Sequence, residues 1–177
     1  MPNNRAVLLI LAMSVIAFSD TIRLPENFTA NFTQMITNPK KKVINYSGKV
    51  RFSDKTLLKW EYLEPTKKEV CTNGLELLVV DHDLEQVSNY LINKGFNLTE
   101  VLKKAKPHSK NIYVAEYQDK KYTVQVDTKG RLQSVAYFDD LENKVQIVFK
   151  NVKYGKGKLP SHLMQCNYPK DYDMIRG

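Results

Sequence analysis

Three histidines and several aspartates are the side chains in this sequence that could hold a metal ion or move a proton. His82, His108 and His162 lie far apart in the sequence, and His82 stands between two aspartates, Asp81 and Asp83. Adjacent residues of a tight turn rarely converge on one ion, because metal ligands must surround it. We therefore interpret this segment as a solvated turn and expect no metal site.

Motifs for covalent or acid–base catalysis are missing. The sequence contains neither a Gly-x-Ser-x-Gly turn nor a His-Glu-x-x-His helix, and the paired carboxylates of Asp139 and Asp140 look like loop residues. Cys71 and Cys166 have no Cys-x-x-Cys partner. They could form a single disulfide in an oxidising compartment or stay reduced, and the sequence leaves both states open. We predict that the protein is not an enzyme and needs no cofactor.

The N-terminal segment predicts export. Arg5 precedes an apolar run from Ala6 to Ala17, and small residues at Ala17 and Ser19 fit the site that a signal peptidase reads. The alternative is a buried N-terminal helix. We expect a signal peptide over residues 1–19 and one mature domain over residues 20–177, located in the periplasm.

The basic composition adds little about partners. The formal net charge is +8, which would suit nucleic acid, an anionic membrane face or an acidic protein. Export argues against nucleic acid, and the lysines are spread along the whole chain rather than gathered in one arm. We therefore interpret most of this charge as solvated surface.

Short β-strands separated by turn residues dominate the chain after residue 42. Apolar residues recur at every second position in several of them, and hairpin-sized connections such as Asp127 to Gly130 predict antiparallel neighbours. About ten strands in one domain must curl or split into two layers. The predicted strands are Val43–Phe52, Leu57–Leu63, Glu69–Thr72, Leu75–Val80, Gln86–Leu91, Ile112–Tyr117, Tyr122–Val126, Leu132–Phe138, Lys144–Tyr154 and a last one near Leu163–Cys166.

Two segments depart from this pattern. Residues 97–106 predict a short amphipathic helix, with Asn97 as N-cap, Pro107 as its stop and one apolar stripe. This helix could plug one end of a barrel or form a lid over an apolar cavity. Residues 25–36 fit both helical and strand spacing, and we expect a helical start that passes into a strand near Phe32. The apolar stripe of the helix predicted over residues 97–106 consists of Leu98, Val101, Leu102 and Ala105.

Several strands carry large apolar side chains at both odd and even positions. The segments Leu57–Leu63 and Leu75–Val80 are the clearest cases. Apolar residues at both odd and even positions are typical of strands whose two faces are both covered. An ordinary packed core would explain this composition, and so would a curved sheet that encloses a binding cavity.

A series of short motifs then occurs in a fixed order along the chain. Taken together, they resemble the outer-membrane lipoprotein carrier protein family, LolA, over nearly the whole mature chain. Each motif is weak alone, and the ordered set is more specific. The motifs are Phe32-Thr33-Gln34, Gly48-Lys49-Val50-Arg51-Phe52, Leu58-Lys59-Trp60, Glu64-Pro65, Thr72-Asn73-Gly74 and Val80-Asp81-His82-Asp83-Leu84-Glu85-Gln86-Val87.

The resemblance implies a mainly β fold, an incomplete antiparallel β-barrel with short helices forming a lid over a hydrophobic cavity. It implies a periplasmic monomer that shelters the acyl chains of lipoproteins. The implied partners are an inner-membrane ABC-type release complex and an outer-membrane acceptor. The alternative function is a binding module of the same fold for another lipid or glycolipid.

The resemblance and the strand pattern together indicate which residues face the cavity. Leu58 and Trp60 match hydrophobic positions of the family, and Tyr62 shares their parity. One position departs from the family, since many members have an Arg-Pro pair whose arginine latches the lid, and this chain has Asp54-Lys55 there. Arg51 should point to the other face of the sheet. The expected cavity residues are Phe28, Phe32, Val50, Phe52, Leu58, Trp60, Tyr62, Leu78 and Val80, under a lid helix bearing Leu98, Val101, Leu102 and Ala105.

Overall fold

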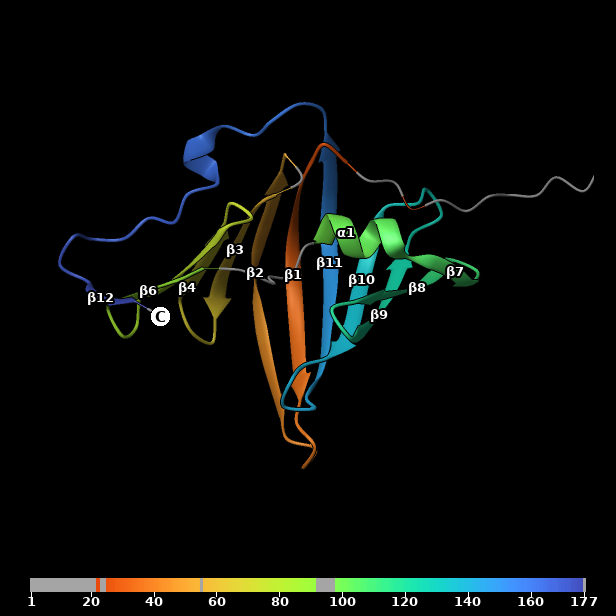
Figure 1. Cartoon of the computed structure of the whole chain (residues 1–177), viewed down its shortest axis with the longest axis horizontal. Helices are drawn as coiled ribbons and strands as arrows, with labels where there is room; N and C mark the ends of the chain where they lie inside the picture. The colour runs from red at the N-terminus through yellow and green to blue at the C-terminus, as the bar shows by residue number, and fades with distance from the viewer. Residues whose placement is uncertain (1–21, 23–24, 55, 92–97, 177) are drawn as a thin grey trace, which may run out of the picture.

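A computed structural model describes residues 22, 25–54, 56–91 and 98–176 of the chain. These residues form one twelve-stranded sheet and one α-helix, α1 (Figure 1). The predicted signal peptide and Lys55 lie outside the described residues. The strands follow one another in the order β12-β6-β5-β4-β3-β2-β1-β11-β10-β9-β8-β7.

The elements have the following bounds. The strands are β1 (Asn27–Thr37), β2 (Val43–Ser53), β3 (Leu57–Glu64), β4 (Lys68–Thr72), β5 (Glu76–Asp81), β6 (Gln86–Leu91), β7 (Lys106–Ser109), β8 (Ile112–Tyr117), β9 (Lys120–Val126), β10 (Leu132–Phe138), β11 (Lys144–Gly155) and β12 (Asp173–Arg176). The helix α1 covers Leu98–Lys104, and a 3₁₀ turn, η1, covers Ser161–Leu163.

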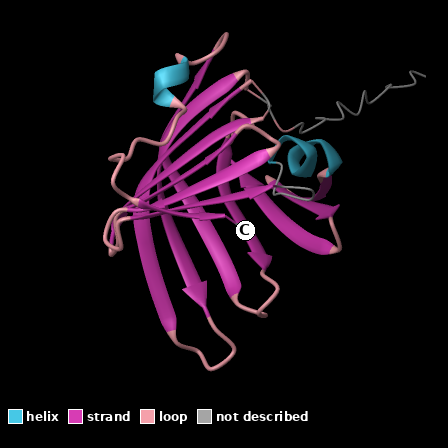
Figure 2. Ribbon diagram, turned by 60° about the vertical axis from the view of Figure 1, so that its left-hand side comes forward, coloured by secondary structure: helices cyan, strands magenta, loops and turns pink. Residues whose placement is uncertain are grey.

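The sheet curls strongly but does not close on itself. Its two edges are β7 and β12, which are not paired with each other, and α1 lies across the concave side (Figure 2). All strand pairs are antiparallel except β12 with β6. The prediction of an unclosed, mainly antiparallel barrel is therefore confirmed. In the described part of the chain, no helix is long and apolar enough to span a membrane.

The concave side of the sheet, which we call the inner face, holds the main core. Phe32 and Val50 are almost completely buried there. The Phe32 ring packs edge-on against Trp60 and Tyr62, with centroids 4.8 and 5.1 Å apart. Aromatic pairs of this geometry add attraction beyond the burial of their area. The inner face is thus an aromatic and aliphatic surface that runs across the central strands.

The mixed prediction for residues 25–36 was wrong in its first half. β1 is one continuous strand from Asn27, and its side chains alternate, with Phe28, Ala30 and Phe32 buried against the core. Both neighbours of β1 pair with it over nearly its whole length. The ladder hydrogen bonds on both sides outweigh the fortuitous helical spacing of the same apolar residues.

The residues after β11, 156–176, form a segment that crosses the convex side of the sheet, which we call the outer face. Cys166 in this C-terminal segment is joined to Cys71 of β4 by a disulfide. The ammonium of buried Lys59 donates a hydrogen bond of 2.7 Å to the carbonyl oxygen of Gln165 and pairs with Glu69 at 2.8 Å. The segment is therefore fastened covalently and by a charged side chain.

The prediction of a strand near Leu163–Cys166 was wrong. The strands β7 and β12 were not predicted. The last predicted strand is replaced by η1 and irregular chain, because this stretch lies over the outer face instead of beside another strand. β12 pairs with β6, far away in the sequence. The helix was correct, although its described part ends at Lys104, and the following residues enter β7.

We predict that Gly48→Ala destabilises the protein by about 3 kcal/mol or more. A Cβ atom at Gly48 would lie 1.9 Å from the carbonyl oxygen of Glu61 and 2.9 Å from the Phe32 ring, so the backbone would have to move. Gly157→Ala is the control, since open space surrounds Gly157 and only its φ of +71° opposes a side chain; it should cost about 1 kcal/mol. Urea unfolding measures both, and equal losses would contradict the prediction.

We also predict that replacing Cys71 and Cys166 together by serine lowers the free energy of unfolding by about 4 kcal/mol, because the disulfide closes a loop with a sequence separation of 95 residues. Urea unfolding of the oxidised chain, the reduced chain and the double variant should give the high value only for the oxidised chain. A loss below about 1 kcal/mol would mean that the C-terminal segment holds its place without the bond.

Candidate functional site

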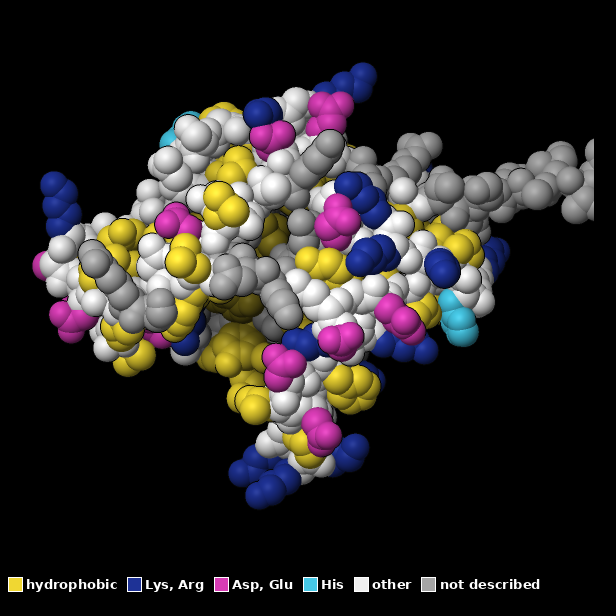
Figure 3. Space-filling view, in the orientation of Figure 1, with side chains coloured by type: hydrophobic (Ala, Val, Ile, Leu, Met, Phe, Trp, Pro, Cys, Tyr) yellow, Lys and Arg dark blue, Asp and Glu magenta, His cyan; other side chains and the backbone are white. Residues whose placement is uncertain are grey.

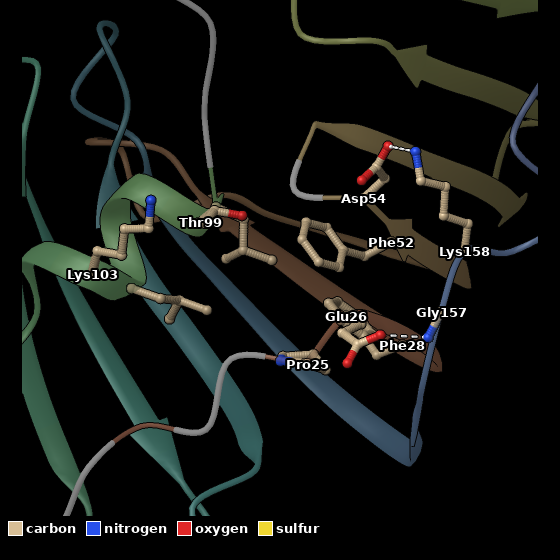
Figure 4. Close-up of a pocket in the computed structure, with 11 residues that line it drawn as sticks. Pro25, Glu26, Phe28, Phe52, Asp54, Thr99, Lys103, Gly157 and Lys158 are labelled. Atoms are coloured by element: carbon tan, nitrogen blue, oxygen red, sulfur yellow. Dashed lines mark hydrogen bonds and ion pairs between the residues drawn. The ribbon is translucent and has the colours of Figure 1, made fainter.

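An apolar pocket lies between α1 and the ends of β1 and β2. Its volume is about 350 Å³, within the range of roughly 300 to 1,000 Å³ found for ligand sites. Phe28 and Phe52 form one wall, with their rings stacked at 5.5 Å, and α1 with Thr99 and Lys103 lies across from them (Figure 4). Leu98 and Leu102 of α1 also line the pocket. The pocket is therefore bounded by the sheet on one side and by the helix on the other.

Charged residues surround the mouth of this pocket. Asp54 pairs with Lys158 at 2.6 Å, and a Glu26 carboxylate oxygen accepts a hydrogen bond from the backbone N–H of Gly157 (Figure 4). Lys103 is on the helix side and pairs with Glu100 at 2.9 Å. An apolar interior with a charged rim fits an amphiphilic ligand whose polar end stays in water.

The four residues predicted for the lid helix belong to the core of the inner face. Leu98, Val101 and Leu102 are buried in it, and Ala105, just after the helix, is partly buried against it. Lys104, at the end of α1, lies over the ring of Tyr117 in β8, 5.1 Å from its centroid. The helix is thus attached to the β8 side of the curled sheet and leans across towards β1 and β2.

The register of the sheet places seven of the nine predicted cavity residues on the inner face and two on the outer face. Residues directly opposite in neighbouring strands point to the same side. Trp60 stands opposite Val70, which stands opposite Val79. Leu78 and Val80 alternate with Val79 and therefore point outwards. The seven inner residues are Phe28, Phe32, Val50, Phe52, Leu58, Trp60 and Tyr62.

The error in β5 comes from its composition. Leu77, Leu78, Val79 and Val80 are all apolar, so alternation gives no sign of which parity faces inwards. Leu78 and Val80 are instead covered on the outer side, where Leu78 lines a cavity beneath the C-terminal segment. The pairing of β5 with β4 was needed to find Leu77 and Val79 as the inner residues.

The position of the family's latch has a different contact in this chain. The Asp54 carboxylate joins the β2–β3 turn to Lys158 of the C-terminal segment. The Asp54 backbone N–H donates to the carbonyl oxygen of Glu26. Arg51 lies on the outer face as expected, paired with Glu61 at 3.0 Å. In this structure the Asp54 side chain therefore fastens the turn to the C-terminal segment rather than to α1.

Potential metal ligands come together at one place in the described residues, where Glu69 lies close to Cys71 and Cys166. The two sulfur atoms are bonded to each other, so neither is a thiolate that could bind an ion. Among the histidines, His82 contacts the Tyr172 hydroxyl at 3.2 Å, whereas His108 and His162 are exposed in β7 and η1.

A few polar side chains interrupt the apolar inner face. The hydroxyl of Tyr62 donates to Gln34 at 3.0 Å, and Gln34 is buried. Burial raises the pKa of Tyr62 far above its usual value, with further contributions from Tyr137 and Tyr46. Burial also raises the pKa of Tyr137 to about 12, helped by Tyr122 and Asp139. Both phenols therefore stay neutral over the physiological pH range.

The fold and pocket define the class of this protein as an unclosed β-barrel with an apolar pocket beneath a helix. Residues 25–102 match the family model described as outer membrane lipoprotein carrier protein LolA. The chain is 35% identical over 149 residues to the outer-membrane lipoprotein carrier protein of Campylobacter jejuni, covering 84% of this chain and 86% of that protein. It therefore belongs to the outer-membrane lipoprotein carrier protein (LolA) family.

A second relative supports this placement, and a solved structure shares the fold. The chain is 31% identical over 127 residues to the outer-membrane lipoprotein carrier protein of Wolinella succinogenes, covering 72% of this chain and 74% of that protein. An uncharacterized conserved protein from Thermus thermophilus has a similar structure, with a TM-score of 0.56, 12% sequence identity and coverage of 87% of this chain and 92% of that chain. At 12% identity, the likeness to the Thermus thermophilus protein shows the fold alone.

We predict that the protein loses stability steeply above pH 10. A phenol whose pKa is raised in the folded state keeps its full contribution below its unfolded pKa of about 10 and loses it as the pH rises further. Burial also raises the pKa of Tyr122 and Tyr154. Tyr62 and Tyr137, which have the largest shifts, should by themselves give a loss approaching about 3 kcal/mol per pH unit. Denaturant unfolding between pH 8 and pH 11.5 measures this slope.

The variant Tyr62→Phe removes one of these groups and should lower the slope by about 1.4 kcal/mol per pH unit. Tyr168→Phe is the matched control, because Tyr168 is exposed and should leave the slope unchanged. A wild-type stability that stays level up to pH 11.5, or an unaltered slope in Tyr62→Phe, would contradict the assignment of alkaline sensitivity to the inner face.

Proposed function

We propose that this protein is a periplasmic carrier that binds the acyl chains of lipoproteins and moves them from the inner to the outer membrane. The observation that carries the proposal is the apolar pocket between α1 and the Phe28–Phe52 wall, continuous with the aromatic inner face. The names of the relatives from Campylobacter jejuni and Wolinella succinogenes support the same role. The protein performs no chemistry on its cargo.

The helix α1 makes binding reversible. Burying an acyl chain stabilises a complex by about 0.8 kcal/mol per methylene, so one chain of about fifteen methylenes would contribute on the order of 12 kcal/mol. That affinity would hold the cargo almost irreversibly. In the empty protein, Leu98, Val101 and Leu102 already occupy the inner face, and the ligand must displace these contacts. The net affinity is lower by the free energy of those contacts.

The route and location belong to the same proposal. The predicted signal peptide over residues 1–19 would deliver the chain to the periplasm, with cleavage after Ser19. Cargo would come from an ABC-type release complex in the inner membrane and pass to an acceptor in the outer membrane.

A release experiment tests the proposal. The purified mature protein is incubated with spheroplasts that have just synthesised a radiolabelled lipoprotein, and the soluble fraction is analysed for lipoprotein bound to the carrier. The expected result is a soluble one-to-one complex. No released lipoprotein, together with a phospholipid or glycolipid found in the protein by mass spectrometry, would overturn the proposal in favour of a carrier of another lipid.

We predict that Leu102→Glu reduces lipoprotein binding at least about tenfold, because Leu102 lines the apolar pocket and a carboxylate there would lose its water to the acyl chain. Leu141→Glu is the matched control, since Leu141 is 77% exposed in the β10–β11 turn and far from the pocket. Both variants should show the wild-type circular dichroism spectrum. Binding of Leu102→Glu at the wild-type level would remove this pocket from the site.

A further inference from the structure

The unclosed sheet ends in two edge strands that differ in how they are protected. β7, at one end, contains Pro107, which has no backbone N–H to offer a neighbouring strand. β12, at the other end, covers Asp173–Arg176 and contains no proline. Natural sheets usually blunt an open edge with proline, lysine, a covering loop or a very short strand, and both edge strands here have four residues. In the described residues, β12 pairs with β6 on one side and with no strand on the other.

The backbone groups of β12 alternate between the two sides. Asp173 pairs with β6, because its N–H donates to the carbonyl oxygen of Glu85 at 2.9 Å. In a parallel pair, every second residue directs both its N–H and its C=O to the same neighbour. Ile175 therefore also faces β6, and Met174 and Arg176 direct their backbone N–H and C=O groups away from the sheet. Water can satisfy these groups in the free protein, and the extended backbone of an added strand would satisfy the whole row together.

Apolar side chains are exposed on both faces of this edge. Met174 is 52% exposed and Ile175 is 44% exposed, and the neighbouring strand β6 adds Tyr90 and Leu91, which are 43% and 74% exposed. Met174 stands opposite Val87 on the outer face, and Ile175 stands opposite Ser88 on the inner face. β12 and β6 lie at the left-hand edge of the molecule in Figure 1, well away from α1. In the space-filling view, hydrophobic side chains are visible over the same edge (Figure 3).

A cavity on the outer face begins at this edge. Its volume is about 530 Å³, and Met174 of β12, Leu78 of β5 and Met164 and Tyr168 of the C-terminal segment line it. The Cys71–Cys166 disulfide forms part of its wall. Because the disulfide holds the chain seven residues before β12, the edge strand and the cavity keep a fixed relation. A cavity beside an open edge is the arrangement by which sheets bind extended peptides, with pockets for alternate side chains.

We propose that the free edge of β12 binds an extended polypeptide segment of a partner protein as a thirteenth strand. The partner segment has apolar side chains at alternate positions, and one of them enters the cavity beside Met174. The outward backbone groups of Met174 and Arg176 recognise the extended backbone, and the cavity selects the side chain. This surface is separate from the lipid pocket, and its occupancy does not depend on the proposed carrier function.

The test uses the disulfide-bonded mature protein and a fluorescein-labelled peptide, Lys-Val-Ser-Val-Ser-Val-Lys, titrated to about 1 mM because short added strands bind weakly. Two further peptides carry methyl groups on the backbone nitrogens, one on the valines and the other on the serines. In strand addition, one set of amides faces β12 and the other faces solvent. The expected result is saturable binding that one methylated peptide loses at least tenfold and the other keeps within about threefold.

Protein variants locate this binding. Met174→Pro removes an N–H that points away from β6, so the β12–β6 pairing should survive while binding falls at least tenfold. Met174→Leu is the matched control and should bind like the wild type. Amide exchange at Ile175 shows whether β12 is still paired. If it is not, the methylated peptides on the wild-type protein decide the question.

Four outcomes would overturn the proposal. They are the absence of saturable binding to the wild type, equal binding of the two methylated peptides, full binding by a Met174→Pro protein that keeps β12 paired, and concentration-dependent self-association through β12 that excludes the peptide. The last outcome, seen by sedimentation velocity, would assign the edge to a second copy of this chain.

Discussion

The apolar inner face of a sheet that does not close is the constraint on which this structure depends. A closed barrel covers its own interior, whereas this sheet leaves a gap between β12 and β7. The short helix α1 covers part of the exposed surface with Leu98, Val101 and Leu102. A helix of this length has little stability of its own, so it is held by the same apolar contacts that a ligand would replace. The surface that α1 covers in the empty protein is therefore the same surface that would bind the ligand.

The two walls of the pocket differ in how firmly they are held. On the sheet side, Asn27 donates hydrogen bonds to the backbone of residues 156 and 157, and Ser53 accepts one from the N–H of Leu159. The Asp54–Lys158 pair adds a charged contact to the same wall. On the helix side, apolar packing and the contact of Lys104 with Tyr117 hold α1. Opening the pocket should therefore move the helix and leave the sheet wall in place.

The C-terminal segment gives the outer face a structure of its own. Lys59 is buried there with Glu69, and an isolated buried ammonium would be very costly. The carboxylate and the carbonyl oxygen of Gln165 compensate for that cost and at the same time fix the segment to the sheet. The disulfide fixes the next residue. These contacts place the end of the segment beside β6, where it forms β12. The four residues of β12 would not form a strand by themselves.

The sequence by itself determined the β character of the chain, the amphipathic helix after residue 97 and most of the inner face. The strands and the helix follow from local periodicity, because every second residue of a strand and every third or fourth residue of a helix share a face. The inner face was assigned from that periodicity together with the family resemblance. Only the tertiary structure decided the face of Leu78 and Val80, the joining of Cys71 to Cys166 and the position of β12. In a uniformly apolar strand, the sequence does not show which alternate residues face inwards. Pairings between residues far apart in the sequence depend on the path of the whole sheet.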